Sequence, residues 1–365
     1  MRLALRLARR GGGTTSPNPM VGAVLVKSGQ IIGRGWHRRA GGPHAEIEAL
    51  RDAGKNGRNP KGATLYVTLE PCCTYGRTPP CTDAIISVGI KKVVIGTTDP
   101  NPRHAGKGFK VLRRAGIAVI HGILADDCAR LNEAFNHWIV RRTPFVTVKA
   151  AMTLDGKIAT VSGESKWITG EKARAHGMKL RQGSDAILVG INTILADNPS
   201  LTARSQKSEA RSQNKNVRLR RIILDSQART PLAAKVISDE FAGLTTIIIG
   251  QHAPKNSVAA LAKRVNVVFA PATNSKLDLR WLLKKLGTEN VTSLLVEGGG
   301  EVNASFLLGG LAQRVAFFYA PKILGGRDAR KAVAGEGAKD LSEVVRLRDV
   351  EWQKLGKDLL LTARI

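Results

Sequence analysis

The segments PHAE (residues 43–46) and EPCCTYGRTPPC (residues 70–81) are the part of the sequence that decides the fold. The first segment opens a predicted helix over His44–Ala53. The second segment connects a predicted strand, Ala63–Leu69, to a predicted helix, Thr82–Val88. A helix, a strand and a further helix in this order predict an α/β domain, in which helices cover the faces of a sheet.

The alternation of strands and helices extends through the rest of the first 140 residues. Apolar side chains near the start of the chain suit a short first helix, and Ser28-Gly29 is typical of a hairpin turn between two strands. The further predicted elements are the strands Val21–Lys27, Ile31–His37, Lys91–Gly96 and Ile117–His121 and the helices Phe109–Ala115 and Ala125–Val140.

The run Arg141-Arg142-Thr143-Pro144 is the predicted boundary between two domains, residues 1–143 and 144–365. A chain of 365 residues is long enough to bury two cores. A second α/β series follows the boundary. Its predicted strands are Phe145–Ala150, Asp185–Gly190, Arg221–Asp225, Thr245–Ile249, Val265–Ala270, Ser293–Val296 and Arg314–Tyr319, and its predicted helices are Glu171–Gln182, Leu277–Leu286 and Glu301–Leu311.

The net charge of +28 belongs to the whole chain and not to a basic tail. Residues 1–142 hold 23 Lys and Arg and 9 Asp and Glu, which gives +14 and leaves +14 for the remainder. A positive surface suits phosphorylated small molecules or nucleic acid. The densest basic run, Arg204–Arg221, is either a solvated loop or a nucleic-acid patch. Because no apolar run approaches about 18 residues, we expect no membrane span and a cytoplasmic location.

Three cysteines fall within ten residues, and in a chain without a secretory signal such a cluster favours metal ligation over disulfides. His44, Cys72 and Cys81 supply three ligands for one catalytic zinc ion, which keeps its fourth position for water. Positive helix ends at His44 and after Cys81 would stabilise the thiolates. Glu46 does not share a helix face with His44, so it need not be a ligand and is free to move protons.

The remaining cysteines and one histidine have less specific interpretations. Cys73 is adjacent to Cys72 and cannot easily turn to the same ion, so we expect a packed thiol. Cys128 lies on the apolar face of a predicted helix and is expected in the core. His37 ends a predicted strand, and contact with a substrate and a purely structural role both remain open.

The segments PNPMVG (residues 17–22), HAE (44–46), EPC to GRTPPC (70–81), DPNP (99–102) and GKG (106–108) together resemble the deaminase half of the bifunctional riboflavin-biosynthesis deaminase–reductases. Eight residues separate the two Cys ligands, whereas general nucleoside and tRNA deaminases usually have two there. The resemblance implies a cytidine-deaminase-like three-layer domain in which Glu46 is catalytic. Asn18 and the loop 74–80 would hold the pyrimidine and its ribose phosphate. The run Cys73-Thr74-Tyr75 departs from the family pattern, in which a His is frequent.

The second half resembles the reductase half of the same family, which is similar to dihydrofolate reductase in fold and uses NADPH. The segments KAAMTLDGK (149–157), GESKWIT (163–169), LADNPSLT (195–202) and DS (225–226) carry this resemblance. A Gly cluster after a predicted strand, 298–300, suits phosphate, although it lacks the G-x-G-x-x-G fingerprint. The implied NADPH residues are Ala151, Trp167, Thr193, Asp197, Ser226, Gly299, Gly300, Glu301, Val302, Asn303, Ala304 and Ser305. The implied substrate residues are Ser165, Arg181, Leu201, Arg204 and Glu297.

Together these observations predict a two-domain enzyme for consecutive steps on phosphorylated pyrimidines. The resemblance implies zinc-dependent deamination of 2,5-diamino-6-(ribosylamino)-4(3H)-pyrimidinone 5′-phosphate. NADPH-dependent reduction of the ribosyl side chain to ribityl would follow. The alternative is a nucleic-acid base deaminase, such as a tRNA deaminase, with an accessory basic domain. It accounts for the charge but not for the segments 164–167 and 296–299, so we expect no nucleic-acid partner. We also expect a homo-oligomer.

Overall fold

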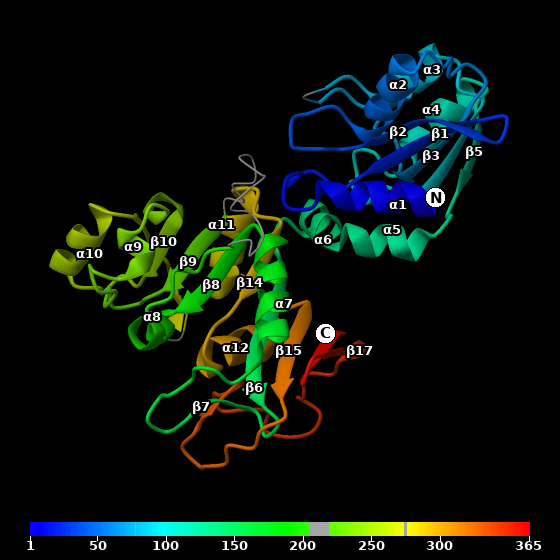
Figure 1. Ribbon diagram of the computed structural model, residues 1–365. Helices are drawn as coiled ribbons and strands as arrows, with labels where there is room; N and C mark the ends of the chain where they lie inside the picture. The colour runs from blue at the N-terminus through cyan, green and yellow to red at the C-terminus, as the bar shows by residue number, and fades with distance from the viewer. Residues whose placement is uncertain (77, 204–218, 274–275) are drawn as a thin grey trace. The chain divides into compact units, whose positions relative to one another are not determined.

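The computed structural model describes residues 1–76, 78–203, 219–273 and 276–365. The chain divides into two compact units, Met1–Thr143 and Pro144–Ile365, and each is described by itself (Figure 1). Most of the basic run Arg204–Arg221, including the predicted substrate residue Arg204, lies outside the described residues.

The first unit contains a five-stranded sheet in the order β2-β1-β3-β4-β5. Strand β1 is antiparallel to both of its neighbours, β2 and β3, whereas β3, β4 and β5 run parallel. Parallel strands place their carboxyl ends at one edge, where the loops after β3 and β4 meet. The strands are β1 (Gly22–Lys27), β2 (Gln30–Trp36), β3 (Thr64–Leu69), β4 (Lys92–Thr97) and β5 (Ala118–His121).

Helices cover both faces of this sheet and make three layers, which confirms the predicted architecture. One face packs against α1 through Ala4 and Leu7 and against α5, and the other packs against α2, α3 and α4 through residues such as Ala49 and Leu112. The helices are α1 (Arg2–Ala8), η1 (Arg9–Gly11), α2 (Ala45–Lys55), α3 (Cys81–Ser87), α4 (Lys107–Arg114), α5 (Ala125–Leu131) and α6 (Glu133–Arg141).

Helix α2 lies unusually close to strand β2, because both surfaces consist of small residues. A side chain at Gly35 would meet the carbonyl oxygen of Ala45 at 2.3 Å, and one at Gly33 would meet that of Ala49 at 2.3 Å. Only glycine permits this approach. The close packing fixes the start of α2, where His44 is the N-cap residue.

The predicted single helix over Ala125–Val140 is wrong, because Asn132 divides it into α5 and α6. The buried Asn132 amide accepts a hydrogen bond from the Met20 N–H at 2.8 Å and donates one to the Met20 carbonyl at 2.9 Å. A long-range contact of this kind leaves no periodic signal in the sequence.

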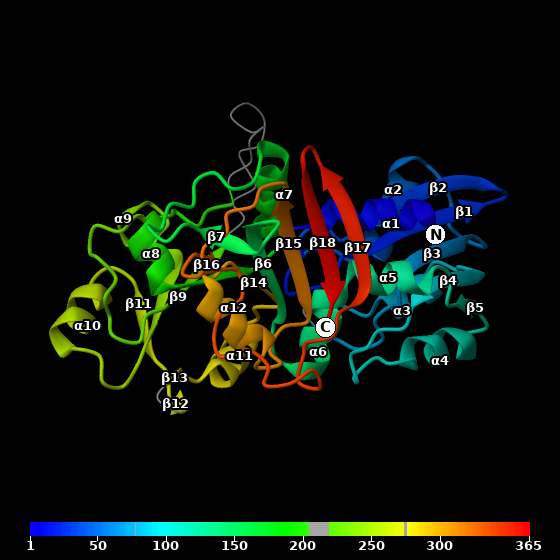
Figure 2. The ribbon, with the colours of Figure 1, turned by 90° about the horizontal axis from the view of Figure 1, so that it is seen from below.

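The second unit is built on a nine-stranded sheet in the order β11-β10-β9-β8-β14-β6-β15-β18-β17. From β11 to β15 in this order, neighbouring strands run parallel. Strand β18 is antiparallel to both of its neighbours, β15 and β17 (Figure 2). The strands are β6 (Phe145–Thr153), β8 (Ala186–Gly190), β9 (Arg220–Leu224), β10 (Thr245–Ile249), β11 (Asn266–Phe269), β14 (Ser293–Val296), β15 (Arg314–Ala320), β17 (Arg348–Leu355) and β18 (Asp358–Arg364). Two small pairs are β7 (Lys157–Ala159) with β16 (Arg330–Lys331) and β12 (Ala272–Thr273) with β13 (Lys276–Leu277).

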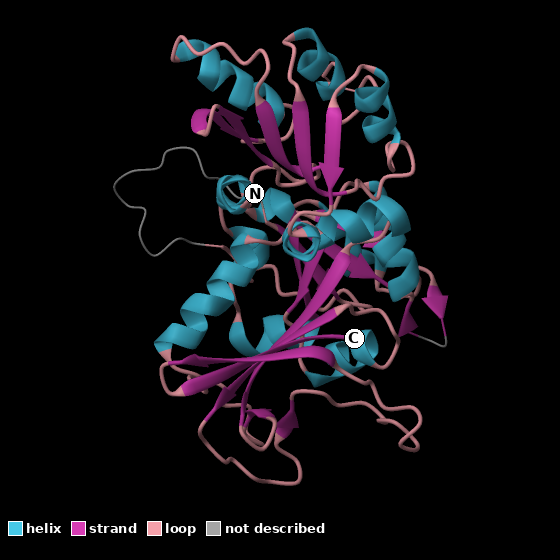
Figure 3. Ribbon diagram, turned by 90° about the vertical axis from the view of Figure 1, so that its right-hand side faces the viewer, coloured by secondary structure: helices cyan, strands magenta, loops and turns pink. Residues whose placement is uncertain are grey.

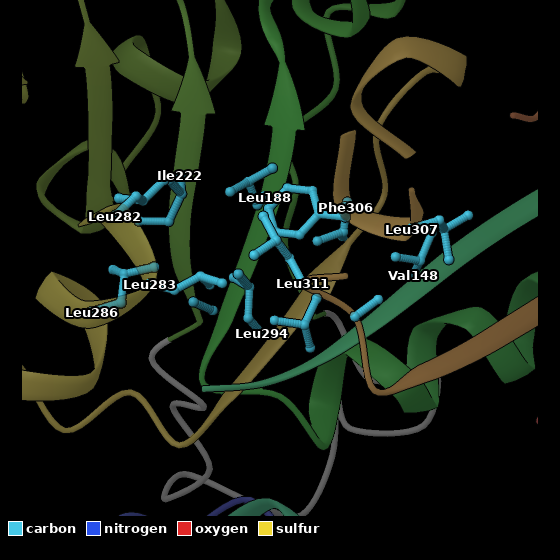
Figure 4. Close-up of a cluster of buried hydrophobic side chains, with 14 of the residues drawn as sticks. Val148, Leu188, Ile222, Leu282, Leu283, Leu286, Leu294, Phe306, Leu307 and Leu311 are labelled. Atoms are coloured by element: carbon cyan, nitrogen blue, oxygen red, sulfur yellow. The ribbon is translucent and has the colours of Figure 1, made fainter. Parts of the chain in front are cut away.

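Separate cores form on the two faces of this sheet. In Figure 4, Phe306 of α12 lies beside Leu188 of the interior strand β8, and Leu283 of α11 belongs to the same core. Ile187 and Val189, which alternate with Leu188, belong to the core on the opposite face. The helices, cyan in Figure 3, are α7 (Glu171–Gln182), α8 (Ile191–Asp197), α9 (Lys235–Ser238), η2 (Ala242–Leu244), α10 (Lys255–Ala262), α11 (Leu279–Thr288) and α12 (Gly300–Leu307).

Several elements of the second unit are absent from the sequence-based prediction. Strand β17 is exposed along almost its whole length, so its residues show no apolar alternation. Helix α8 has only seven residues, and α12 ends at Leu307, not at Leu311 as predicted, because the chain turns through Gly310 with a positive φ of 64°. Within the described ranges, no helix is both long and apolar enough to cross a membrane.

Candidate functional site

The three predicted metal ligands of the first unit meet at one point. The ligand atoms of His44, Cys72 and Cys81 all lie within 4.8 Å of one another. His44 Nδ1 is 3.2 Å from the Cys81 sulfur and 3.5 Å from the Cys72 sulfur. Zinc bonds of about 2.0 Å to nitrogen and about 2.3 Å to sulfur separate tetrahedral ligand atoms by roughly 3.5 Å. The donor set therefore fits zinc in both chemistry and spacing.

Three different elements position these ligands. His44 caps α2, Cys72 follows the end of β3, and Cys81 is the first residue of α3. The Cys81 N–H donates to the Cys72 sulfur at 3.3 Å, and the Thr82 N–H donates to the Cys72 carbonyl at 3.2 Å. The start of α3 thus supplies N–H groups to one ligand while it carries another, as expected for thiolates at a helix N-terminus.

The electrostatics of the cluster favour a metal-binding thiolate at Cys72. The hydrogen bond with the Cys81 thiol lowers the pKa of Cys72 to about 4, although burial opposes the shift, and the hydrogen bond to His44 adds to it. The same hydrogen bond to Cys72 raises the pKa of His44 above its usual value. Sharing a proton with Cys72 raises the pKa of the Cys81 thiol.

Glu46 lies in the first turn of α2, is 3% exposed, and lines the same cavity as His44 and Cys72. Burial raises the pKa of its carboxyl group to about 7, and the nearby Cys72 sulfur contributes to the shift. Its carboxylate is not part of the metal-ligand group formed by His44, Cys72 and Cys81. A carboxyl group with a pKa near neutrality can both take up and release a proton under working conditions.

A cavity of about 290 Å³ lies beside Glu46, and the predicted substrate residue Asn18 and His37 also line it. His37 is 2% exposed, and its Nδ1 lies 2.9 Å from the Pro43 carbonyl, so Nδ1 carries the proton and donates. Its Nε2 then accepts from the Asn18 amide nitrogen at 3.0 Å. Burial lowers the pKa of His37, and the Pro43 hydrogen bond opposes the shift only partly. His37 therefore has a structural partner on each side and still lines the cavity.

Sequence reasoning did not assign the opposite wall of this cavity, although the DPNP segment marks it. Asp99, Asn101 and His104 line it after β4. Burial raises the pKa of Asp99 to about 6. The wall is held by Glu70, whose carboxylate accepts from the N–H groups of three residues, Asp99, Gly106 and Gly108.

Of the remaining cysteines, Cys128 lies in the core as predicted, whereas Cys73 is only partly buried. The Cys73 sulfur lies 3.8 Å from His104 Nδ1 and is not part of the His44, Cys72 and Cys81 group. Cys128 is fully buried against β4, where a side chain at Gly96 would meet its sulfur at 2.3 Å. Both thiols are free.

The second unit contains a cavity of about 780 Å³ at the carboxyl ends of its parallel strands. Residues 190–197 after β8, Leu224 at the end of β9 and the turn after β14 all contribute to it. This is the place where open α/β sheets bind their ligands, and the volume is within the usual range of about 300–1,000 Å³. The predicted residues that line it are Ser165, Thr193, Asp197, Gly299, Gly300, Glu301 and Val302.

The glycine turn before α12 can receive a phosphate group. Gly299 is the N-cap of α12, and a side chain there would meet nothing within 4 Å. Side chains at its neighbours would collide, at Gly298 with Val302 at 2.4 Å and at Gly300 with the Lys331 carbonyl at 2.4 Å. There is therefore no room for a side chain at Gly298 or Gly300, whereas the space beside Gly299 is open. A ligand can reach backbone N–H groups there, at a positive helix end.

Other predicted cofactor residues do not line this cavity. The Asn303 amide is buried and donates to the Ala332 carbonyl at 2.8 Å. Trp167 is 66% exposed, with the Arg174 guanidinium 4.6 Å from its ring centre. The cavity is also not lined by the predicted cofactor residues Ala151, Ser226, Ala304 and Ser305 or by the predicted substrate residues Arg181, Leu201 and Glu297.

Arg181 and Glu297 form a bidentate ion pair, with both nitrogen–oxygen distances at 2.8 Å. Lys149 lies 3.5 Å from the same carboxylate. Burial alone would raise the pKa of Glu297, but the charges of Lys149 and Arg181 outweigh it and hold the pKa at about 2. Leu201 is a core residue, with 2% of its surface exposed.

Comparison with known proteins supports both units. Residues 1–97 match the family model of the cytidine and deoxycytidylate deaminase zinc-binding region, and residues 144–361 match the RibD C-terminal domain. The riboflavin biosynthesis protein RibD of Actinobacillus pleuropneumoniae is 44% identical over 361 residues, which cover 99% of this chain and 93% of that protein. The RibD of Escherichia coli is 39% identical over 366 residues, which cover 99% and 97%.

A solved structure is similar over the whole chain. It is the diaminohydroxyphosphoribosylaminopyrimidine deaminase/5-amino-6-(5-phosphoribosylamino)uracil reductase of Thermotoga maritima, with 38% identity, a TM-score of 0.85 and coverage of 100% of this chain and 97% of that one. The alternative of a nucleic-acid deaminase left the second unit without an explanation, whereas the match over residues 144–361 supplies one. In this chain His44, Cys72 and Cys81 form the zinc site, and the reductase domain implies NADPH. The chain belongs to the RibD family, the bifunctional deaminase–reductases of riboflavin biosynthesis, which act on phosphorylated pyrimidines.

Proposed function

We propose that residues 1–143 deaminate 2,5-diamino-6-(ribosylamino)-4(3H)-pyrimidinone 5′-phosphate. Residues 144–365 then reduce the ribosyl side chain of 5-amino-6-(5-phosphoribosylamino)uracil to ribityl. The observation that carries this proposal is the convergence of His44, Cys72 and Cys81 within 4.8 Å next to the buried Glu46. Similarity along 99% of the chain to RibD proteins, and the name of the Thermotoga maritima enzyme, supply the substrates.

In the deamination step, a bound zinc ion would make water nucleophilic near neutral pH. Glu46 takes the proton that this water loses and delivers it to the pyrimidine ring nitrogen. A second proton transfer through Glu46 lets the amino group leave as ammonia, and a carbonyl remains on the ring. The pKa of about 7 suits Glu46 to both directions of transfer. Asn18, held by His37, holds the pyrimidine ring.

In the reduction step, NADPH would supply a hydride to C1′ of the open-chain imine form of the sugar, and a proton from water would go to the imine nitrogen. The Gly299–Gly300 turn and the start of α12 hold its phosphates. Thr193 and Asp197 line the cavity that would receive the rest of the cofactor. Asp197 accepts a hydrogen bond from the Ser165 hydroxyl at 3.1 Å, which places a proposed substrate residue beside a proposed cofactor residue. Residues that lie outside the cavity, such as Trp167 and Arg181, would reach the ligands only through a rearrangement of their side chains.

The test supplies the diaminopyrimidine phosphate to zinc-loaded protein with and without NADPH and identifies the products by mass. We expect the deaminated ribosyl compound without NADPH and the deaminated ribityl compound with it. Deamination of tRNA or single-stranded DNA, without NADPH oxidation in the presence of the pyrimidine phosphate, would contradict the proposal.

We also propose a cytoplasmic homo-oligomer. Cys73 and Cys128, which are not zinc ligands, are free thiols, which agrees with a reducing compartment. Strand β17 is an exposed sheet edge that carries Val350 and Trp352 at 46% and 58% exposure, and such edges pair readily with another chain. Light scattering after gel filtration tests the oligomer, and a molar mass equal to that of one 39.2 kDa chain would contradict it.

A further inference from the structure

A short segment that lines the second cavity carries two basic side chains that no motif predicts. The cavity strap is defined here as residues 329–335, which include β16. Arg330 and Lys331 line the cavity and, among the described residues that do so, are the only basic ones. Both are exposed, and neither side chain has a hydrogen bond or ion pair with any described residue. Two unpaired positive charges thus lie in a cavity proposed to take a polyanion.

The backbone of the cavity strap is held on several sides, so its side chains are presented from a fixed base. Ala329 and Ala332 are each 3% exposed and anchor it. The Ala332 N–H donates to the Gly156 carbonyl at 2.9 Å, and the Ala334 N–H donates to the Gly300 carbonyl at 3.1 Å. In β16, Arg330 pairs with Ala159 of β7. A ligand would therefore meet charges whose backbone is already ordered, which lowers the entropic cost of binding.

The strap also adjoins the phosphate-binding turn. The Lys331 carbonyl is so close to Gly300 that any side chain there would meet it at 2.4 Å. On the other side, the Arg330 guanidinium lies 3.4 Å from the position that a side chain would take at Gly163, which also lines the cavity. The backbone of Lys331 thus adjoins the glycine turn, and the Arg330 guanidinium lies beside Gly163.

The two acidic residues of the cavity, Asp197 and Glu301, form no ion pair with Arg330 or Lys331 among the described residues. Asp197 accepts from the Ser165 hydroxyl, and Glu301 accepts from the Gly335 N–H at 3.4 Å. The two basic side chains are therefore available to an incoming anion.

We infer that Arg330 and Lys331 bind the diphosphate of the dinucleotide cofactor, opposite the N–H groups of the Gly299–Gly300 turn. A guanidinium and an ammonium add charge-assisted hydrogen bonds to those of the turn. The diphosphate is chosen over the phosphate on the adenosine ribose because the strap contacts the turn itself. This inference rests on the proposed function.

The experiment measures the binding of NADPH and of NADH to the full-length, zinc-loaded protein, without pyrimidine, by calorimetry or nicotinamide fluorescence. The variants are Arg330→Ala, Lys331→Ala and the double substitution. Arg327→Ala is the matched control, because Arg327 is an exposed arginine three residues before Arg330 and is not among the residues that line the cavity. Unfolding temperatures check that the fold is retained.

We expect each single substitution to raise the Kd for NADPH and for NADH by the same factor, roughly tenfold. The salt dependence of binding should weaken in the double variant, as expected when phosphate contacts are lost. Arg330→Lys should recover part of the affinity, and Arg327→Ala and the deaminase rate should stay unchanged.

Unchanged affinities in the double variant would overturn the inference. So would a loss confined to NADPH, which would assign the charges to the ribose phosphate. If the unsubstituted protein binds neither dinucleotide, the proposed reductase function itself fails, and the two failures are therefore distinguishable.

Discussion

The two cavities of this chain are built on different principles. The first holds about 290 Å³ and takes its reactive groups from four side chains between His44 and Cys81. The second holds about 780 Å³ and is lined by segments spread from Ile158 to Ala334, many of them turns and strand ends. Metal and proton chemistry needs particular donor atoms, whereas a cavity for a large cofactor needs mainly space, backbone N–H groups and a few charges.

The largest effect that would test this difference is the loss of one metal ligand. We expect Cys81→Ser to lose zinc and, with it, almost all deamination, because a neutral hydroxyl replaces a buried thiolate. Elemental analysis measures the zinc content, and Cys73→Ser is the control from the same loop. Retention of stoichiometric zinc in Cys81→Ser would remove this residue from the ligand set.

A substitution at the proton carrier should separate chemistry from metal binding. Glu46→Gln should lower the deamination rate by about 10²- to 10⁴-fold while zinc stays bound, because an amide cannot accept and return the proton. Glu48→Gln is the matched control, since Glu48 is on the same helix and pairs with Arg38 at 3.0 Å. If zinc is lost together with activity, Glu46 has been misassigned.

The buried ion pair between Arg181 and Glu297 should stabilise the second unit by an amount that depends on pH. The pKa of Glu297 is lowered from 4.5 to about 2, so its stabilising effect is present above pH 4.5 and is lost as the pH falls through about 2. Glu297→Gln should lower the free energy of unfolding of the second unit by about 3 kcal/mol at pH 7.

This stability difference should shrink progressively below pH 4.5, as chemical denaturation at several pH values would measure. Glu289→Gln is the control, because its ion pair with Arg220 is about one-third exposed and such pairs contribute under about 1 kcal/mol. A difference between Glu297→Gln and the unsubstituted protein that stays constant down to pH 2 would show that charge is not its origin.

The smallest expected effect tests whether the two cavities work independently. Asp197→Asn should lower NADPH turnover by roughly tenfold, because the Ser165 hydroxyl loses a charged acceptor. Steady-state assays of each step measure this, and deamination should not change. An equal loss of both activities would show that the two sites are coupled.

The first site could be predicted from sequence because its reactive groups are side chains of particular residue types. The spacing of His44, Cys72 and Cys81 implies one metal, and the structure brings their ligand atoms together. Local apolar patterns also predict many strands of both units, and β10 and β14 of the second unit coincide with their predicted ranges. Resemblance to a family supplied the substrates, which no spacing could.

The second site was less predictable because long-range contacts build it. Nothing in the local sequence indicates that Arg330 lies beside Gly163, or that Arg181 is paired with Glu297. Arg221 shows the same limit: it is 1% exposed because Asp239 and the Thr245 hydroxyl satisfy its guanidinium inside the protein. Charged residues of this kind look like surface residues until their partners are known.

The Asn132 amide has a practical consequence for fragments of the protein. The match to the zinc-binding region stops at residue 97, yet Phe135, Trp138 and Ile139 of α6 line the first cavity. Asn132, at the start of that helix, is joined to both backbone groups of Met20, next to Asn18 and Pro19 in the cavity wall. A piece cut at residue 97 would keep every metal ligand and lose one side of the pocket, so a minimal catalytic fragment has to extend through Arg141.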